Sequence, residues 1–545
     1  MGDTAISTAA ADRYRAQGWW REETVLDDLR RAVAATPDKT ALVCYQSVPT
    51  GEFGPVSLTY RELAEKVERI AGNLHRLGVR HGDVVTLHLP NTWQLAALIL
   101  ACARIGAVAG PIVPIMRRRE VEFMVGLTES PVYIAAAEFR RFDYAAMSAE
   151  VAANVPTLRH RVILGGGAVG GSLDFDAELL DTESSLDGAV EAGPDDLAQV
   201  MFTSGTTGEP KGVVHSHNTL HSMNKAQADV LGLTADEVTA MGSPTAHQAG
   251  YTWNLLMPLH LGATSVHVDH WDARVMLPIL AQRRVTFFMG APPFLSDLVN
   301  WQLETPYDLS ALAVFATGSA PVPPVLVEGC VEVLGCRLYA LWGMTENGCV
   351  TITRPEEPVL RASESDGTAV PGMRVRLVDD NGDPVPPGAV GALQVRGSAQ
   401  CLGYYRRQDA YAENVTADGW FDTGDLARDD GHGGIRITGR VKDLIMRGAE
   451  NIPAVEVEAA LLRHTAVTDV AVVGYPDERL GERACAVVVA ADGAALTMDD
   501  LTSHLDGLGM VKHYWPERLE LVPALPRTPS GKIQKFALRE LLRAQ

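Results

Sequence analysis

Apolar positions recur with two different periods along the first 320 residues, and these periods predict helices and strands in turn. Apolar residues spaced three and four positions apart predict helices over residues 60–77 and 93–103. Short apolar runs flanked by Gly or Pro predict strands at residues 84–89, 263–268, 285–289 and 313–317. Helices that alternate with short buried strands are typical of a layered α/β fold.

The pattern changes beyond residue 370. Apolar and polar residues alternate around Asn381, which predicts antiparallel hairpins and a β-subdomain at about 370–438. The remaining chain predicts a helix that opens after Pro453, followed by short strands. We therefore expect a large, multi-layer N-terminal α/β domain at 1–440, which contains the β-subdomain, and a small C-terminal α+β domain at 441–545.

Composition narrows the class of protein. The chain has 545 residues, of which 46% are hydrophobic and 21% are charged, so it is long and apolar enough to form several large cores. Its formal net charge of −21 has the wrong sign for a non-specific nucleic-acid binder or a protein of anionic lipid surfaces. An anionic ligand must therefore be held by a locally prepared site.

The cysteines and the apolar stretches indicate a compartment. Seven cysteines are scattered without a CxxC pair or a Cys/His metal spacing, which favours a reducing environment. The N-terminus has no apolar run of the kind that forms a signal peptide. The longest apolar stretch, residues 95–115, is interrupted by Arg104 and by Gly and Pro residues, which predicts a buried helix and turn. We expect a cytoplasmic protein without a membrane span.

Residues 200–214 are the most informative segment. A strand-like run leads into three glycines, several hydroxyl residues and one lysine, so backbone N–H groups, hydroxyls and a positive charge can all face phosphate oxygens. The spacing does not fit a Walker A motif, and Pro210 prevents the helix that would follow one. This segment predicts a polyphosphate site made by Thr203, Ser204, Gly205, Thr206, Thr207, Gly208 and Lys211.

A second glycine-rich segment, residues 165–170, matches GxGxxG and follows an apolar run. A dinucleotide fold requires a helix that opens directly from such a turn, and the following residues do not begin a helical pattern. We interpret it as a connecting loop. The alternative function of an NAD-dependent oxidoreductase rests on this segment alone.

Four further segments follow the phosphate loop in a definite order, and they carry a resemblance to a known family. They are LWGMTE at 341–346, GWFDTGD at 419–425, GRVKDLIMRGAENIP at 439–453 and PRTPSGK at 526–532. Together with the loop, the series resembles the acyl-adenylate-forming (ANL) superfamily over about residues 25–540. Residues 244–250 and 447–458 are most similar to the branch of cyclohexanecarboxylate and medium-chain acyl-CoA ligases.

The resemblance implies an ATP site with a magnesium ion. Glu346 would ligate Mg²⁺, Thr345 would contact phosphate, and Asp425 would accept hydrogen bonds from both ribose hydroxyls. Trp342 stands where the family usually has a tyrosine that stacks on adenine. Further nucleotide contacts implied in the same way are Gly318, Ser319, Ala320, Gly343 and Arg440.

The resemblance also implies two poses of the C-terminal domain. Lys532 would stabilise the charge that grows as the acid attacks the α-phosphate. Lys442 would lie at the hinge about which the domain swings. After the swing, Gly448 would replace Lys532 and leave a path for pantetheine, because it has no side chain.

The candidates for the acid pocket are one histidine and a set of mainly apolar residues. His247 lies where the family often places a residue that gates the pocket and the thiol tunnel, although a lone histidine is more often structural. The other candidates suit an apolar acid and equally suit an ordinary core. They are Tyr251, Gly318, Leu341, Met344 and Cys349.

We expect an acid–CoA ligase that uses ATP, Mg²⁺ and coenzyme A and forms an acyl-AMP. The acid would be of medium chain length, alicyclic or aromatic. One alternative is an adenylating ligase that transfers the acyl group to a carrier-protein thiol or activates an oxyacid other than a carboxylate. Another is a catalytically silent nucleotide-binding regulator. A homodimer is left open.

Overall fold

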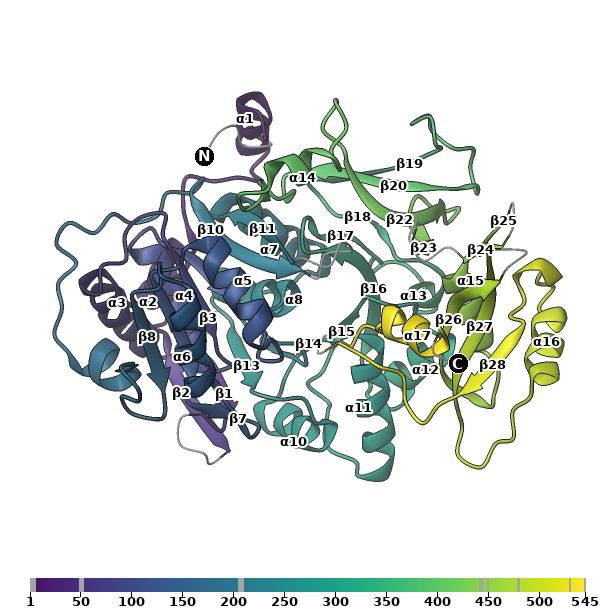
Figure 1. Ribbon diagram of the computed structural model, residues 1–545, viewed down its shortest axis with the longest axis horizontal. Coiled ribbons are helices and arrows are strands. Elements are labelled where there is room, and N and C mark those ends of the chain that lie inside the picture. Colours follow the sequence, from purple (N-terminus) through teal and green to yellow (C-terminus); the bar gives the residue numbers. More distant parts are fainter. Residues whose placement is uncertain are drawn as a thin grey trace.

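The computed structural model describes residues 6–48, 53–203, 210–440, 445–447, 450–477, 481–528 and 531–543. Figure 1 shows sheets and helices of the N-terminal part, a β-rich region above them in green, and the C-terminal part at one end in yellow. The expected α/β organisation, with a large N-terminal and a small C-terminal part, is confirmed.

One large sheet carries the phosphate-loop segment. Its eight strands lie in the order β21-β11-β10-β4-β3-β5-β8-β9. Most neighbours in it are parallel, whereas β10, β11 and β21 form an antiparallel edge. The strands are β3 (Val84–His88), β4 (Val108–Pro111), β5 (Val132–Ala136), β8 (His160–Leu164), β9 (Leu173–Asp174), β10 (Leu197–Thr203), β11 (Lys211–Ser216) and β21 (Gly403–Tyr404).

A second sheet of nine strands lies beside the first, in the order β18-β17-β16-β15-β14-β12-β13-β1-β2. It contains the strands expected from the apolar runs at 263–268, 285–289 and 313–317. Its strands are β1 (Thr40–Gln46), β2 (Gly54–Thr59), β12 (Val238–Met241), β13 (Thr264–Val268), β14 (Phe287–Met289), β15 (Val314–Thr317), β16 (Arg337–Met344), β17 (Gly348–Ile352) and β18 (Thr368–Ala369).

The helices that matter for the site pack between and around these sheets. The two predicted helices form α3 (Tyr60–Arg76) and α4 (Trp93–Arg104). Thr59 and Glu62 make a capping box that fixes the start of α3. Also important are α2 (Val25–Ala35), α7 (His217–Leu231), α8 (Gln248–Tyr251) and the π-helical turn η2 (Thr252–Leu256) that continues α8.

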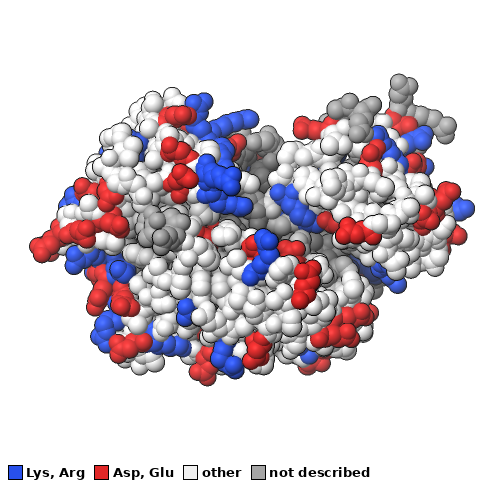
Figure 2. Space-filling view, turned by 90° about the horizontal axis from the view of Figure 1, so that it is seen from below, with Lys and Arg blue, Asp and Glu red and all other residues white. Residues whose placement is uncertain are grey.

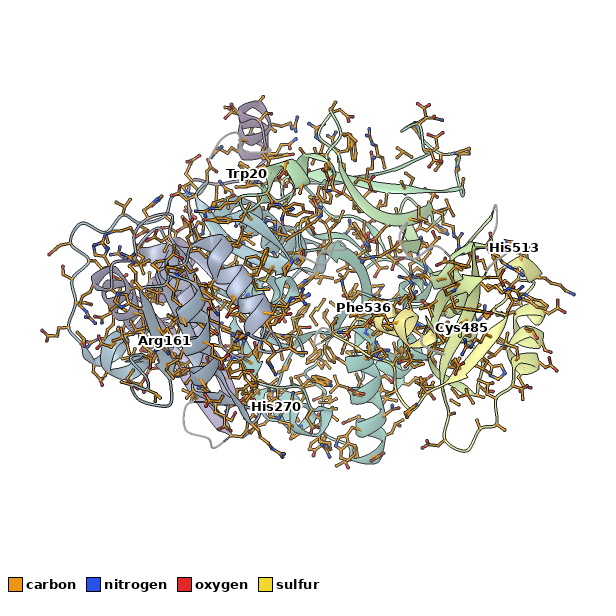
Figure 3. The ribbon with its side chains drawn as sticks, viewed as in Figure 1. Trp20, Arg161, His270, Cys485, His513 and Phe536 are labelled. Carbon is orange, nitrogen blue, oxygen red and sulfur yellow. The ribbon has the colours of Figure 1, made fainter. Side chains whose placement is uncertain are left out.

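Between residues 373 and 440, four strands form a separate antiparallel sheet in the order β19-β20-β22-β23, whereas β21 belongs to the eight-stranded sheet. The hairpin expected around Asn381 joins β19 (Met373–Val378) to β20 (Val390–Gly397). The other strands are β22 (Phe421–Asp429) and β23 (Ile435–Arg440). The N-terminal segment is tied to this region, because the Trp20 indole N–H donates to the Ser398 carbonyl at 2.9 Å; Figure 3 shows Trp20 beside α1 (Thr8–Ala16).

The C-terminal part combines a sheet with helices on its surface. The helix expected after Pro453 is α15 (Ala454–Leu461). The sheet contains β24 (Ile445–Arg447), β25 (Glu450–Ile452), β26 (Val467–Asp477), β27 (Gly481–Ala490) and β28 (Arg518–Leu521), and the other helices are α16 (Met498–Gly507) and α17 (Lys535–Arg543).

The glycine-rich segment 165–170 is a connecting loop, as expected. It joins β8 to β9, and the Arg161 guanidinium, labelled in Figure 3, donates to the Gly170 carbonyl. The next helical turn begins only at Asp176. A dinucleotide-binding turn would open directly into a helix, so this loop lacks that geometry.

Three expectations from the sequence concern the chain as a whole. All seven cysteines are buried free thiols. The apolar stretch 95–115 forms most of α4 and then β4, and within the described residues no helix is both long and apolar enough to cross a membrane. Acidic and basic side chains are interspersed on the face shown in Figure 2, despite the net charge of −21.

Candidate active site

The predicted phosphate loop joins the two strands of an antiparallel hairpin. Thr203, at the end of β10, pairs with Lys211, at the start of β11. A strand therefore follows the loop where a Walker A motif would have a helix. The predicted residues Ser204, Gly205, Thr206, Thr207 and Gly208 lie outside the described residues.

Thr345 and Glu346 occupy the tight turn between β16 and β17. The turn depends on glycine, because a Cβ built on Gly343 would lie 2.1 Å from the carbonyl oxygen of Gly348. Gly348 itself has a φ of +63°, which favours glycine. His215, on β11, fixes the turn by a contact of 2.8 Å between its Nε2 and the Thr345 carbonyl oxygen.

The Glu346 carboxylate is buried and lies among cationic groups. Burial raises the pKa of Glu346, and the charges of Lys211 and Lys532 act in the opposite direction. The Tyr404 hydroxyl donates a hydrogen bond of 3.0 Å to Glu346 Oε1. The amino group of Lys211 lies 4.8 Å from the centre of the Tyr404 ring.

Tyr404 is a site residue that the sequence reasoning missed. It lies on β21, which pairs with β11 and so brings Tyr404 opposite Val213. The only sequence signal was an aromatic pair after Gly403, outside the four ordered segments. A strand of two residues gives no periodic pattern, so its pairing could not be predicted.

Asp425 is held by two donors. The Trp342 indole N–H donates to Asp425 Oδ2 at 2.8 Å, and the Arg440 guanidinium donates to Oδ1 at 2.7 Å. Arg440 reaches it because the two residues are cross-strand partners on β22 and β23. Trp342 thus contacts the predicted ribose-binding carboxylate, a contact that its comparison with a stacking tyrosine did not predict.

Lys532 brings the C-terminal part to these residues. Burial and the nearby Arg440 charge lower the pKa of Lys532, whereas the charges of Asp425 and Glu346 raise it. Its loop is closed by a hydrogen bond of 3.1 Å from the Lys532 N–H to Thr528 Oγ1. A Cβ built on Gly531 would lie 3.3 Å from the Ala291 methyl group, so this loop packs against the start of α11 (Pro292–Glu304).

His247 begins α8 near Lys532. It caps this helix, since its Nδ1 accepts a hydrogen bond of 3.4 Å from the Ala249 N–H. Burial and the charge of Lys532 lower the pKa of His247 to about 4. The imidazole is therefore neutral at pH 7.

The acid-pocket candidates fall into two groups. Gly318 and Leu341 are in contact across β15 and β16, because a Cβ built on Gly318 would lie 2.7 Å from the Leu341 carbonyl oxygen. Met344 and Cys349 belong to the adjoining β16–β17 hairpin. Tyr251 lies on α8 and lines a separate small cavity. A larger residue at 318 would therefore push two strands apart as well as narrow a pocket.

The segment after Gly318 is strained and accessible. Ser319 has a φ of +77°, which is uncommon for a residue with a side chain, and both Ser319 and Ala320 are exposed. Strained backbone is often found at ligand-binding segments. The predicted hinge residue Lys442 and the predicted tunnel residue Gly448 lie outside the described residues.

The carboxylate of Glu346 fits a magnesium ion. Mg²⁺ prefers oxygen ligands and is usually bound by one or two carboxylates together with substrate phosphates and water. The Tyr404 hydroxyl contacts Oε1 of this carboxylate, and the charge of Lys211, at the start of β11, acts on Glu346. Across the residues that the structure describes, no cluster of three His, Cys, Asp or Glu side chains forms a closed metal cage.

Comparisons with known proteins agree with this arrangement. The AMP-binding enzyme family matches residues 29–405, and the AMP-binding enzyme C-terminal domain matches residues 456–532. A medium-chain fatty-acid–CoA ligase of Escherichia coli (strain K12) is 34% identical, with 97% of this chain and 92% of the relative covered.

Other relatives differ in their printed activities. A salicyl-AMP ligase / salicyl-S-ArCP synthetase of Mycobacterium tuberculosis is 33% identical, with 97% of this chain and 93% of the relative covered. The crystal structure of the anthranilate CoA ligase AuaEII in complex with anthranoyl-AMP has a TM-score of 0.86 and 26% identity, with 96% of this chain and 98% of that chain covered.

Proposed function

Because the chain belongs to the AMP-binding enzyme family, we propose that it activates a carboxylic acid with ATP and then transfers the acyl group to coenzyme A. In the first step, a carboxylate oxygen attacks the α-phosphorus, the bond to the bridging oxygen breaks, and pyrophosphate leaves. In the second step, the thiol sulfur attacks the acyl carbon, AMP leaves with the bonding electrons, and the thiol proton passes to solvent.

The single observation that carries this proposal is the convergence of Lys532, Glu346 and Asp425. Lys532 comes from the C-terminal part and experiences the charges of both carboxylates, which belong to distant segments of the chain. The reaction brings two anions together, so a cation held at this point stabilises the transition state. Lys532 has this role in the proposal, and Lys211 adds positive charge at the end of the phosphate loop.

The nucleotide would lie along the other converging residues. Asp425 would accept hydrogen bonds from the ribose, with Trp342 and Arg440 holding the carboxylate in place. Gly343 and the exposed Gly318-Ser319-Ala320 segment would border the base, and the phosphate loop with Thr345 would hold the phosphates. Glu346 would hold Mg²⁺, which neutralises phosphate charge when bound.

The second step needs a different partner for the acyl-AMP. In the proposal, residues 1–440 and 441–545 are the two domains, and the chain near Lys442 is the hinge. Rotation of the C-terminal domain about this hinge would withdraw Lys532 and present Gly448 to the thiol. The docked loop at Gly531 supports the first of these poses, since it places Lys532 beside Glu346 and Asp425.

The acid in this proposal is of medium chain length, alicyclic or aromatic. The pocket candidates His247, Leu341, Met344 and Cys349 offer an uncharged, mainly apolar lining, because His247 is neutral. A second acceptor is a carrier-protein thiol. This candidate is favoured by the relative whose printed name includes salicyl-S-ArCP synthetase.

A screen of pyrophosphate release tests the proposal. Purified protein is given ATP, Mg²⁺ and short, medium-chain, alicyclic or aromatic acids, with CoA, with a pantetheinylated carrier protein or with neither. We expect acid-dependent pyrophosphate with at least one acid and a thioester with CoA. A thioester formed only on the carrier protein would replace CoA as the acceptor, and nicotinamide-dependent turnover without ATP would contradict adenylation.

A further inference from the structure

A small buried cavity lies between α7 and the segment that leads into α2. Its lining includes five polar or charged side chains, namely Arg21, Asp28, His217, His221 and Asn224. Tyr251 and several apolar side chains complete the lining. His217, His221 and Asn224 are spaced by four and three residues, so they share one face of α7.

These side chains carry unused hydrogen-bonding atoms. His217 Nε2, His221 Nδ1, Asn224 Oδ1 and Arg21 Nε are buried and have no partner among the described residues. The exposed fractions of His217, His221 and Asn224 are only 6%, 8% and 4%. Buried polar atoms are normally paired, and an unpaired one destabilises the fold by about 1–3 kcal/mol. Four such atoms around one cavity indicate a site prepared for a ligand group.

The cavity favours a neutral group. Asp28 pairs with Arg21 at 2.5 Å and also contacts Arg31 and His260, so the Arg21 charge already has its counterion. Burial lowers the pKa of His217 to about 4 and that of His221 to about 2. Both imidazoles are neutral at pH 7, and each ring can donate or accept a hydrogen bond. A hydroxyl or carbonyl oxygen suits these atoms better than an additional ion.

The cavity and His247 are joined by the short helix α8. His247 feels the charge of Lys532, and Tyr251 lies one helical turn farther along α8. Helix α7 packs directly on this turn, since Gln248 Nε2 lies 3.5 Å from Met223 Sδ. One turn of helix is about 5.4 Å, so α8 carries Tyr251, in the lining of the cavity, about this far beyond His247.

We infer that this cavity is a subsite that recognises a hydroxyl or carbonyl group at the distal end of the acid. It makes the enzyme selective for oxygenated acids over their plain hydrocarbon counterparts. The inference rests on the proposed function, because the acid is the molecule that reaches past His247. Water fills the cavity when an acid without such a group is bound.

Matched acids test this subsite. Straight-chain acids of six to ten carbons and cyclohexanecarboxylate are each paired with their distal hydroxy and keto derivatives, and kcat/KM is measured from pyrophosphate release. We expect at least one oxygenated derivative to exceed its parent acid by about tenfold or more, since a site built for hydrogen bonds rejects analogues that lack them. Asn224→Leu should abolish this preference by lowering the ratio toward one.

Lys225→Ala is the matched control, because the neighbouring Lys225 pairs with Asp229 on the outer side of α7. It should leave the ratio unchanged. His221→Gln serves as the second variant if Asn224→Leu does not fold. Two results would overturn the subsite. One is a wild-type kcat/KM that is the same for the oxygenated acid and its parent in every pair. The other is a variant that lowers kcat/KM equally for both acids of a pair.

Acid-dependent thermal shifts separate this inference from the proposed function. If no acid releases pyrophosphate, the proposed function fails. The oxygenated acids should still raise the Tm of the wild type more than their parents do, and this difference should vanish in the variants. Equal shifts for both members of each pair would reject the subsite independently of turnover.

Discussion

Asp425 illustrates how much of the site is prepared by single residues. Its two oxygens accept separate hydrogen bonds from Trp342 and Arg440, and the side chain is buried. Charge-assisted hydrogen bonds of this length are about twice as strong as neutral ones, so they fix the carboxylate that we propose as the ribose contact. The Trp342 indole therefore helps to position the Asp425 carboxylate. A tyrosine at position 342 has a shorter reach and would place its donor group elsewhere.

Lys532 gives a prediction about pH. Burial and the charge of Arg440 lower its pKa, so Lys532 loses its proton at a lower pH than a free lysine does. We expect acid-dependent pyrophosphate formation to fall on the alkaline side as this proton is lost. Arg440→Met removes a repelling charge and should raise the pKa of Lys532, which moves the alkaline limb of the pH–rate profile to higher pH.

Arg428→Met is the control for this shift, because Arg428 is an exposed arginine on the neighbouring strand. It should leave the alkaline limb in place. The position of the limb is the informative quantity, since under the proposed function Arg440→Met would also weaken nucleotide binding and so lower the rate at every pH. A limb that stays fixed or moves to lower pH in Arg440→Met would refute the predicted coupling.

At the scale of elements, the sequence predicted those with a regular pattern. The period of apolar residues located α3, α4 and β13 to within a few residues, because each has a continuous buried face. It did not locate α7, whose buried residues include many polar ones, or the two-residue strand β21. The contacts of the site join residues 58 and 83 positions apart, and local patterns carry no information on such pairings.

The β16–β17 hairpin yields a prediction about Gly343. A methyl group at this position would meet the Gly348 carbonyl oxygen at 2.1 Å, so Gly343→Ala must open the turn that carries Thr345 and Glu346. Overpacking of this kind destabilises a fold by about 1–3 kcal/mol. We expect a lower Tm and a loss of pyrophosphate formation that exceeds the loss of folded protein.

Gly126→Ala is the matched control for this substitution. Gly126 lies in the helix α5 (Arg118–Thr128), and a Cβ there meets nothing within 4 Å. Alanine favours a helix over glycine by up to about 1 kcal/mol, so this variant should keep its activity and hold or raise its Tm. A Gly343→Ala protein with the wild-type Tm and the wild-type rate of pyrophosphate formation would contradict this prediction, because it would show that the turn tolerates the extra methyl group.

At the scale of the whole molecule, the N-terminal and C-terminal parts both contribute residues to the candidate site. The loop that carries Lys532 packs against Ala291, a residue far away in the sequence. If the C-terminal part turns for the second step, Lys532 serves the first step alone. Lys532→Ala should therefore reduce acid-dependent pyrophosphate formation by about 10²–10³-fold, as is usual for the loss of one transition-state donor.

The same variant should form thioester from pre-made acyl-AMP and CoA at close to the wild-type rate. Lys512→Ala is its control, since Lys512 is an exposed lysine in the same C-terminal part, and both rates should be unchanged in it. Lys442→Pro should show the opposite defect, because proline restricts φ at the proposed hinge. Equal impairment of both steps in Lys532→Ala and Lys442→Pro would contradict the two poses.

The burial of every cysteine has a practical consequence for experiments on the proposed rotation of the C-terminal part. Thiol reagents attack exposed thiolates, and burial shields the native thiols from such reagents. Cysteines introduced at the exposed positions Asp38 and Lys512 would therefore take up fluorophores or spin labels without prior removal of the native ones. Distances between such a pair of probes would test the proposed domain rotation in solution, one substrate at a time, without interference from the native thiols.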